Sequence, residues 1–259
     1  MSDLASPFDL SGRLALVTGS SRGIGAAIAD GLARSGAAVI LNGRDESRLA
    51  GALESARRRL PSASWTARAF DVTDEAAIEQ AVAHCESVTG PIDILVNNAG
   101  IQVRAPLTEI SVENWRAVID TDLTSAFLMG RTVAPRMIQR GRGKIINVCS
   151  VQSELARPSI GAYTAAKGGL RNLTRAMAAE WSSAGLQVNG LAPGYIRTEM
   201  TAPLAADPDF DAWVRNRTPA RRWGRVEDLA GPAVWLASAA SDFVTGQVIY
   251  VDGGMTSVV

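Results

Sequence analysis

The 259-residue sequence contains only two cysteines, Cys85 and Cys149, and one histidine, His84. Two cysteines cannot form a disulfide framework, which indicates a reducing compartment. There is no HExxH motif, no CxxC motif and no cluster of carboxylates. We therefore expect no metal site, and we interpret His84 as an ordinary helix residue.

The sequence also lacks an excess of charge and a long apolar run. Its 26 basic and 26 acidic side chains balance, which gives no support to binding of nucleic acid or of an acidic membrane surface. No window approaches the roughly 18 apolar residues of a membrane span. The start, Met-Ser-Asp-Leu, has neither the basic nor the apolar part of a signal peptide. We expect a cytoplasmic protein without nucleic-acid or membrane partners.

Short apolar segments alternate with longer helical patterns along the chain. The expected strands are 13–18, 37–42, 64–70, 92–96, 143–149, 186–191 and 246–251, and the expected helices are 23–35, 46–59, 74–88, 112–139, 161–184 and 226–239. This alternation predicts an α/β fold of Rossmann type, a doubly wound, seven-stranded parallel sheet with helices on both faces. The length and the absence of a long linker favour a single dinucleotide-binding domain over residues 1–259.

Residues 195–224 break the alternation and carry three prolines and two tryptophans. We interpret this segment as a substrate loop with short helices that covers the site, because long insertions of this kind often act as lids. A static excursion on the surface is the alternative.

A glycine-rich turn follows the first expected strand. Residues 18–25 read Thr-Gly-Ser-Ser-Arg-Gly-Ile-Gly, and an alanine-rich helix comes next. Strand, glycine turn and helix open a dinucleotide-binding unit, in which the helix N-terminus offers free N–H groups to phosphates. Gly19 would permit the tight turn, Gly23 the approach of a pyrophosphate, and Gly25 close packing of the helix on the strand.

Tyr163 and Lys167 stand one helical turn apart, and Ser150 ends an expected strand. A phenol has a pKa of about 10, and an ammonium on the same helix face lowers it. A serine hydroxyl could then hold a substrate oxygen beside the phenol. The Tyr-x-x-x-Lys spacing alone is also found where a buried tyrosine merely neighbours a lysine. However, all the candidate residues follow the carboxyl ends of expected strands, where open parallel sheets bind ligands.

These motifs together with Asn97-Asn-Ala-Gly100 and Pro193-Gly194 resemble the short-chain dehydrogenase/reductase family over about residues 10–254. The resemblance implies that Tyr163 exchanges a proton with the substrate oxygen, that Lys167 lowers the pKa of Tyr163 and binds the nicotinamide ribose, and that Ser150 positions the substrate. Hydride moves between cofactor and carbonyl carbon without a metal. The family commonly forms homotetramers through two long helices, here 112–139 and 161–184.

The resemblance also implies a set of cofactor contacts. They are Gly19, Ser21, Arg22, Gly23, Ile24, Gly25, Arg44, Asp71, Val72, Asn98, Ala99, Gly100, Tyr163, Lys167, Pro193, Gly194, Ile196 and Thr198. Gly43 stands where an acid would bind the ribose 2′-hydroxyl, and Arg44 follows it. Arg44 and Arg22 suit a 2′-phosphate, so we expect NADP(H) to be preferred and NAD(H) to be possible. An exposed arginine pair is the alternative.

Asp122 stands where the family usually has an asparagine, so it joins the candidate catalytic set. The family residue holds a helix distortion and a water that leads to the lysine. An ionised carboxylate cannot donate as an amide does, and its charge would keep Lys167 protonated. We expect the relay to survive with altered efficiency. A solvent-facing helix residue is the alternative.

Finer stretches, such as Asn98–Arg104 and Cys149–Leu155, resemble the gluconate 5-dehydrogenase branch of the family. This implies NADP(H)-dependent interconversion of a secondary alcohol and a ketone on a small polyhydroxy substrate, such as gluconate and 5-keto-gluconate. The candidate substrate-binding residues are Ser150, Tyr163, Arg104, Gln152 and Glu154, with Arg104 pairing the carboxylate and Arg157 as a second cation. Two alternatives stay open: a 3-oxoacyl thioester (acyl carrier protein) reductase, and a dinucleotide-sensing binding protein without catalysis.

Overall fold

Seven parallel strands form one sheet in the order β3-β2-β1-β4-β5-β6-β7, which confirms the predicted fold class. The computed structural model describes residues 6–259, so the first four residues, in which we expected no signal peptide, lie outside the described part. The strands are β1 (Leu14–Val17), β2 (Ala38–Gly43), β3 (Trp65–Ala69), β4 (Ile94–Asn97), β5 (Gly143–Val148), β6 (Leu186–Pro193) and β7 (Val248–Val251). Each strand overlaps a predicted one.

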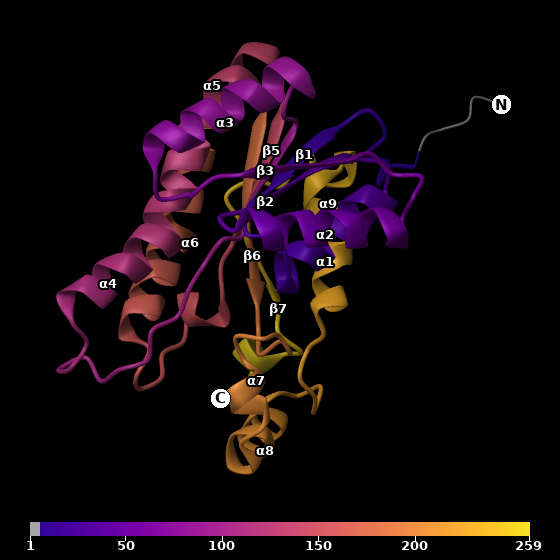
Figure 1. Cartoon of the computed structure of the whole chain (residues 1–259). Coiled ribbons are helices and arrows are strands. Elements are labelled where there is room, and N and C mark those ends of the chain that lie inside the picture. The colour runs from indigo at the N-terminus through magenta and orange to yellow at the C-terminus, as the bar shows by residue number, and fades with distance from the viewer. Residues whose placement is uncertain (1–5) are drawn as a thin grey trace.

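Helices cover both faces of the sheet (Figure 1). On one face lie α1 (Gly23–Arg34), α2 (Glu46–Arg59) and α9 (Ala230–Ala237). On the other face lie α3 (Glu75–Val88), α5 (Ser125–Arg140) and α6 (Gly161–Trp181), with α4 (Val112–Ile119) beside α6. Within residues 6–259, no helix is long and apolar enough to cross a membrane.

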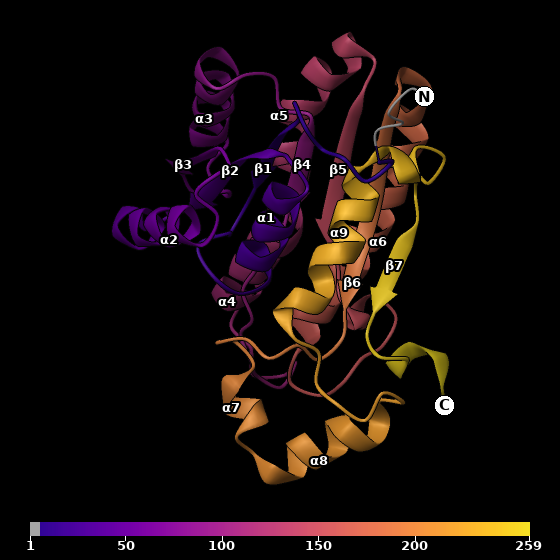
Figure 2. The same ribbon diagram turned by 90° about the vertical axis from the view of Figure 1, so that its right-hand side faces the viewer.

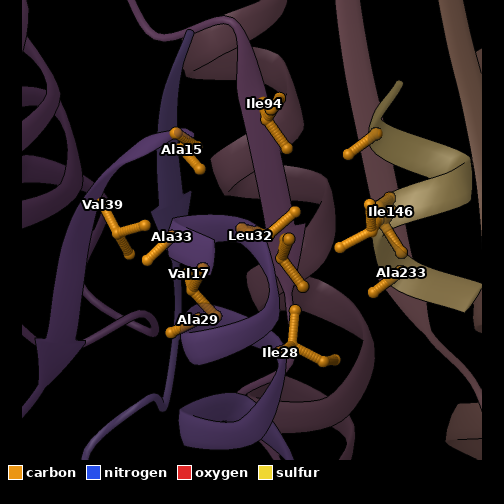
Figure 3. Close-up of a cluster of buried hydrophobic side chains, with 14 of the residues drawn as sticks. Ala15, Val17, Ile28, Ala29, Leu32, Ala33, Val39, Ile94, Ile146 and Ala233 are labelled. Atoms are coloured by element: carbon orange, nitrogen blue, oxygen red, sulfur yellow. The ribbon is translucent and has the colours of Figure 1, made fainter. Parts of the chain in front are cut away.

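Helix α1 is held on the sheet by side chains spaced one turn apart. Ile28 and Leu32 are fully buried, and they belong to the same cluster of apolar side chains as Val17 and Ile94 on the neighbouring strands (Figure 3). This i, i+4 spacing forms the apolar stripe of an amphipathic helix. Burial of each such side chain contributes about 1.5–3 kcal/mol. The packing fixes the N-terminus of α1, and with it the glycine turn, at the carboxyl edge of the sheet.

The helix predicted over residues 112–139 is divided in the structure. A π-helical turn, η1 (Asp120–Thr124), lies between α4 and α5. Such turns insert one extra residue and often occur at functional sites. The hydrophobic pattern continues through the turn, so it gave no sign of the interruption. The π-helical turn contains Asp122, whose side chain is directed into the protein.

Beyond the carboxyl ends of the strands lie two short helices, α7 (Ala202–Ala205) and α8 (Pro208–Arg217) (Figure 2). They belong to the predicted substrate loop, 195–224. The loop has an aromatic cluster of its own, in which other rings pack edge-on against the ring of Tyr195. The distance between ring centres is 5.6 Å to Phe210 and to Trp213 and 5.7 Å to Trp223. The loop is therefore a packed unit beyond the sheet edge where the predicted catalytic residues lie.

Candidate active site

A cleft of about 700 Å³ opens at the carboxyl edge of the sheet. All the predicted cofactor-binding residues and all four predicted catalytic residues line it. They come from the ends of β1 to β6 and from the start of α6, because parallel strands bring their carboxyl ends to the same edge. The structure therefore brings together residues that are up to about 180 positions apart in the sequence.

The glycine turn at one side of the cleft is fixed by Asn98. Its amide Nδ2 donates to the carbonyl oxygens of Thr18 at 2.9 Å and of Gly19 at 3.0 Å. Gly19 has a left-handed backbone with φ of 61°, which favours glycine. A Cβ on Gly25 would lie 2.6 Å from the Gly19 carbonyl oxygen and would also collide with Asn98. Gly25 thus makes room for the turn and for Asn98, in contrast to the predicted packing of helix on strand.

Gly23, the first residue of α1, also has a left-handed backbone, with φ of 59°. A Cβ at this position would meet no atom within 4 Å, so the backbone borders open space in the cleft. The first turn of α1 therefore faces the space where the pyrophosphate is predicted to lie, and helix N-termini offer free N–H groups to anions.

Three guanidinium groups line the same end of the cleft. Arg22 pairs with Glu199 of the substrate loop, and Arg44 lies 3.3 Å from the Asp71 carboxylate. Although partial burial raises the pKa of Asp71, hydrogen bonds from Thr73 and the Arg44 charge hold it below its ordinary value. The third guanidinium belongs to Arg48. This end of the cleft therefore has one guanidinium more than was predicted, and the carboxylates of Glu199 and Asp71 pair with two of the three.

The sequence reasoning missed Arg48 and Glu199. Arg48 stands four residues after Arg44, so the spacing of one helical turn was a signal that could have found it. Glu199 directly follows Thr198, and no local pattern links it to Arg22, which is 177 residues away. Only the folded chain brings the acid of the substrate loop to the glycine turn.

The phenol of Tyr163 and the ammonium of Lys167 lie on neighbouring turns of α6. The Lys167 Nζ atom is 5.5 Å from the centre of the Tyr163 ring and donates to the carbonyl oxygen of Val148 at 2.9 Å. Ser150 follows β5 with an extended backbone, and its Oγ atom accepts from the Gln152 N–H at 3.1 Å. Because that N–H occupies a lone pair of the serine oxygen, the orientation of the hydroxyl is restricted.

Asp122 does not face solvent: its carboxylate is fully buried. One oxygen, Oδ1, accepts from the Ile101 N–H at 2.8 Å, and the other, Oδ2, lies 3.3 Å from Lys167 Nζ. A Cβ on Gly100 would lie 2.7 Å from Oδ2. The glycine of the Asn-Asn-Ala-Gly motif thus makes room for the carboxylate, and the ammonium is held by one carboxylate and one backbone carbonyl.

Burial and charge act in opposite directions on these groups. Burial raises the pKa of Tyr163; Lys167 opposes the rise, Asp122 adds to it, and Ser150 lowers the pKa as a hydrogen-bond partner. Burial alone would lower the pKa of Lys167, but Asp122 and Tyr163 outweigh it and keep the pKa above its usual value. Burial also raises the pKa of Asp122, against the Lys167 charge. Lys167 therefore carries a proton at neutral pH.

The structure brings only part of the predicted substrate-binding set into the cleft. Ser150 and Tyr163 line it, whereas Arg104, Gln152 and Glu154 lie outside the cavity wall. Glu154 is exposed and pairs with Arg171 of α6. Gln152 is buried, and its Oε1 atom has no hydrogen-bond partner within residues 6–259. Arg104 donates to Gln102, which does line the cleft, at 3.2 Å.

Cys149, beside Ser150, is buried as predicted for a residue at the end of a strand. Burial raises the pKa of its thiol to about 11, so the group is protonated at neutral pH and is a poor nucleophile. Over the described part of the chain, no group of three or more metal-binding side chains comes together.

A family model, curated relatives and solved structures all match nearly the whole chain. The family model described as Enoyl-(Acyl carrier protein) reductase matches residues 19–256. The gluconate 5-dehydrogenase of Gluconobacter oxydans is 56% identical over 251 residues, which cover 96% of each chain. The 2-dehydro-3-deoxy-D-gluconate 5-dehydrogenase of Formosa agariphila is 46% identical over 255 residues, which cover 97% of this chain and 96% of the relative. The crystal structure of a gluconate 5-dehydrogenase from Burkholderia cenocepacia, in complex with NADP and tartrate, superposes with a TM-score of 0.94 at 51% identity and covers 98% of both chains.

Proposed function

Since the chain belongs to the short-chain dehydrogenase/reductase family, we propose that it interconverts gluconate and 5-keto-gluconate, or a closely related sugar acid, with NADP(H). Relatives that share about half of their residues with this chain are named as sugar-acid dehydrogenases, and the match covers nearly their whole length. The observation that supports catalysis most directly is the convergence of Ser150, Tyr163 and a buried, protonated Lys167 in one cleft. A binding protein without catalysis would not need this buried ionic arrangement.

The residues of the cleft fit a phosphorylated dinucleotide. The open backbone at Gly23 and the first turn of α1 would hold the pyrophosphate. Arg22, Arg44 and Arg48 supply positive charge where a 2′-phosphate would lie. When bound, the nicotinamide cofactor donates or accepts the hydride. NAD(H) lacks the 2′-phosphate and would use only part of these contacts.

The protein's own part in the reaction is to hold the substrate oxygen and to move one proton. Ser150 and Tyr163 would bind the oxygen from two sides. During reduction the Tyr163 hydroxyl donates its proton to that oxygen, and during oxidation the phenolate removes the proton. The Lys167 ammonium stabilises the phenolate, while the Asp122 carboxylate keeps the ammonium protonated. Asp122 itself does not touch the substrate, so it acts by positioning and charging Lys167.

The organisation of the chain leads to three further proposals. The whole chain works as one dinucleotide-binding domain, and residues 195–224 form its substrate loop. The protein assembles as a homotetramer through the faces of α4, α5 and α6, where large apolar side chains such as Phe127 and Ile138 are exposed. It acts in the cytoplasm, where the two buried thiols would stay reduced.

Replacement of Tyr163 with phenylalanine tests the proton donor. Tyr163→Phe removes only the hydroxyl, so cofactor affinity and the melting temperature should change little. Loss of a general acid lowers the rate by about 10²–10⁴, measured as kcat for 5-keto-gluconate reduction with NADPH. A variant that turns over at nearly the wild-type rate would exclude Tyr163 as the donor.

Replacement of Asp122 with asparagine tests the buried carboxylate. Asp122→Asn should fold normally and keep activity within roughly tenfold, about 1.4 kcal/mol in barrier. Asp122 raises the pKa of Tyr163, so its removal should move the rise of the alcohol-oxidation rate to lower pH. Rates measured across the pH range will decide this. Complete inactivation, or a shift to higher pH, would contradict the assignment.

The cofactor preference is tested by exchanging the residues that would meet the ribose. Wild-type protein should bind NADPH more tightly than NADH. Gly43→Asp combined with Arg44→Ala should move the preference toward NADH by roughly tenfold or more, because a carboxylate accepts from ribose hydroxyls and repels a phosphate. A Cβ at position 43 would make only ordinary contacts, 3.6 Å or longer, so the variant should fold. Tighter binding of NADH by the wild type would contradict the NADP(H) assignment.

Steady-state rates with several carbonyl compounds test the substrate. The wild type should reduce 5-keto-gluconate well and an acetoacetyl thioester poorly. Arg104→Ala should raise KM for the sugar acid by roughly tenfold, since a hydrogen bond to a charged group is lost. Its KM for a neutral ketone should stay the same. Strong thioester turnover without sugar-acid turnover would identify a thioester reductase.

A further inference from the structure

Arg104 and Arg157 belong to two segments that lie side by side, because the Ala105 N–H donates to the Ser159 carbonyl oxygen at 3.0 Å. Arg157 belongs to the segment between η2 (Val151–Ser153) and α6, and Arg104 belongs to the segment after β4. Burial and then the positive charge of Arg157 hold the pKa of Arg104 below its ordinary value. The pairing of the two segments brings the two cations near each other, in agreement with this effect on the pKa of Arg104.

Neither cation pairs with an acid in the part of the chain that the structure describes. Among residues 6–259, no carboxylate lies within 4.0 Å of Arg104 or Arg157. Arg104 donates to the neutral side chain of Gln102 at 3.2 Å, and the Nε atom of Arg157 is buried without a hydrogen-bond partner. Two adjacent cations without an acid attract an anion, and the attraction is stronger where water is partly excluded.

The substrate loop adds a hydroxyl group to this pair. The hydroxyl oxygen of Tyr195 is buried and has no hydrogen-bond partner in the described part of the chain. Burial raises the pKa of Tyr195, Arg157 and Arg104 lower it, and Tyr163 raises it further. Tyr195 stands between Gly194 and Ile196, which line the cleft, and its ring packs against Phe210, over which Arg157 lies.

Packing holds Arg157 and Tyr195 in place. The Arg157 guanidinium lies over the Phe210 ring, 5.3 Å from its centre, and Phe210 in turn packs against Tyr195. A guanidinium stacked on an aromatic ring keeps its donors in one plane. Arg104 is exposed and has no such support. The fixed donors are thus those of Arg157 and Tyr195.

We propose that Arg157 and Tyr195, together with Arg104, bind the carboxylate of the substrate and so favour free sugar-acid anions over neutral polyhydroxy ketones. The inference rests on the proposed function and assigns to it two residues that determine specificity. A guanidinium matches the two oxygens of a carboxylate, and the tyrosine hydroxyl donates to one of them. Lactones, esters and neutral polyols lack the anion and would leave these donors buried and unpaired.

The first test compares charged and neutral substrates. Arg157→Gln keeps a polar side chain but removes the charge, and it should raise KM for 5-keto-gluconate by roughly 10- to 100-fold. Tyr195→Phe keeps the aromatic cluster and should raise KM by roughly 3- to 10-fold. Turnover of L-sorbose, a neutral polyhydroxy ketone, and KM for NADPH should not change in either variant. The matched control is Arg116→Gln, because Arg116 is exposed on α4 away from the cleft.

The second test separates this inference from the proposed function. Tartrate should raise the melting temperature of the wild-type complex with NADP, and this rise should be lost in Arg157→Gln but kept in Arg116→Gln. If the wild type reduces 5-keto-gluconate and Arg157→Gln leaves its KM unchanged, the carboxylate site is wrong and the function stands. If tartrate stabilises only proteins with Arg157 but no sugar acid is reduced, the anion site stands and the function is wrong. A KM increase of equal size for L-sorbose would show a merely structural role and overturn the proposal.

Discussion

The parallel direction of all seven strands is the constraint on which the rest of the structure depends. Since every strand ends at the same edge, the segments after β1 to β6 form the wall of one cleft. The registers between neighbouring strands then determine how far each side chain reaches into the cleft. Asn97 pairs with Asn147 in the β4–β5 register, so the Asn-Asn-Ala-Gly segment lies beside the stretch that leads to Ser150. Asn98 ties that wall to the glycine turn through two hydrogen bonds. One amide side chain thus joins the expected cofactor and catalytic sides of the cleft.

Much of this arrangement could be predicted because it depends on local pattern. Each strand and helix follows from an apolar period, and the cleft follows from where the strands end. The apolar period did not indicate the π-helical turn at Asp120–Thr124, because the turn changes the hydrogen bonding of the backbone without altering the period; only the family resemblance implied a helix distortion at Asp122. The sequence also did not decide whether the Asp122 side chain faces the protein interior or solvent, because that depends on the interruption of the helix. Long-range pairs were also out of reach, as the contact between Arg22 and Glu199 illustrates.

The substrate-binding side chains were the least predictable part. Four polar residues near Ser150 and the Asn-Asn-Ala-Gly motif were equally good candidates for substrate binding in the sequence, but their surroundings differ in the structure. Glu154 forms an ion pair with Arg171, and the amide oxygen of Gln152 is buried. Among residues 6–259, no acid pairs with Arg104 or Arg157. The difference arises from tertiary contacts with α6 and with the substrate loop, which a single sequence does not reveal.

The buried pair of Asp122 and Lys167 explains how a family pattern can tolerate a charge at this position. A carboxylate without a partner in this environment would be strongly destabilising, whereas an ion pair with further hydrogen bonds can offset most of the desolvation. The Ile101 N–H and the Val148 carbonyl supply those hydrogen bonds, one to each member of the pair. The pair also has opposing effects on Tyr163: the ammonium favours the phenolate, and the carboxylate favours the phenol. A phenol that keeps its proton is the form needed for reduction of a ketone. The charge at Asp122 therefore opposes ionisation of the Tyr163 phenol while it keeps Lys167 protonated.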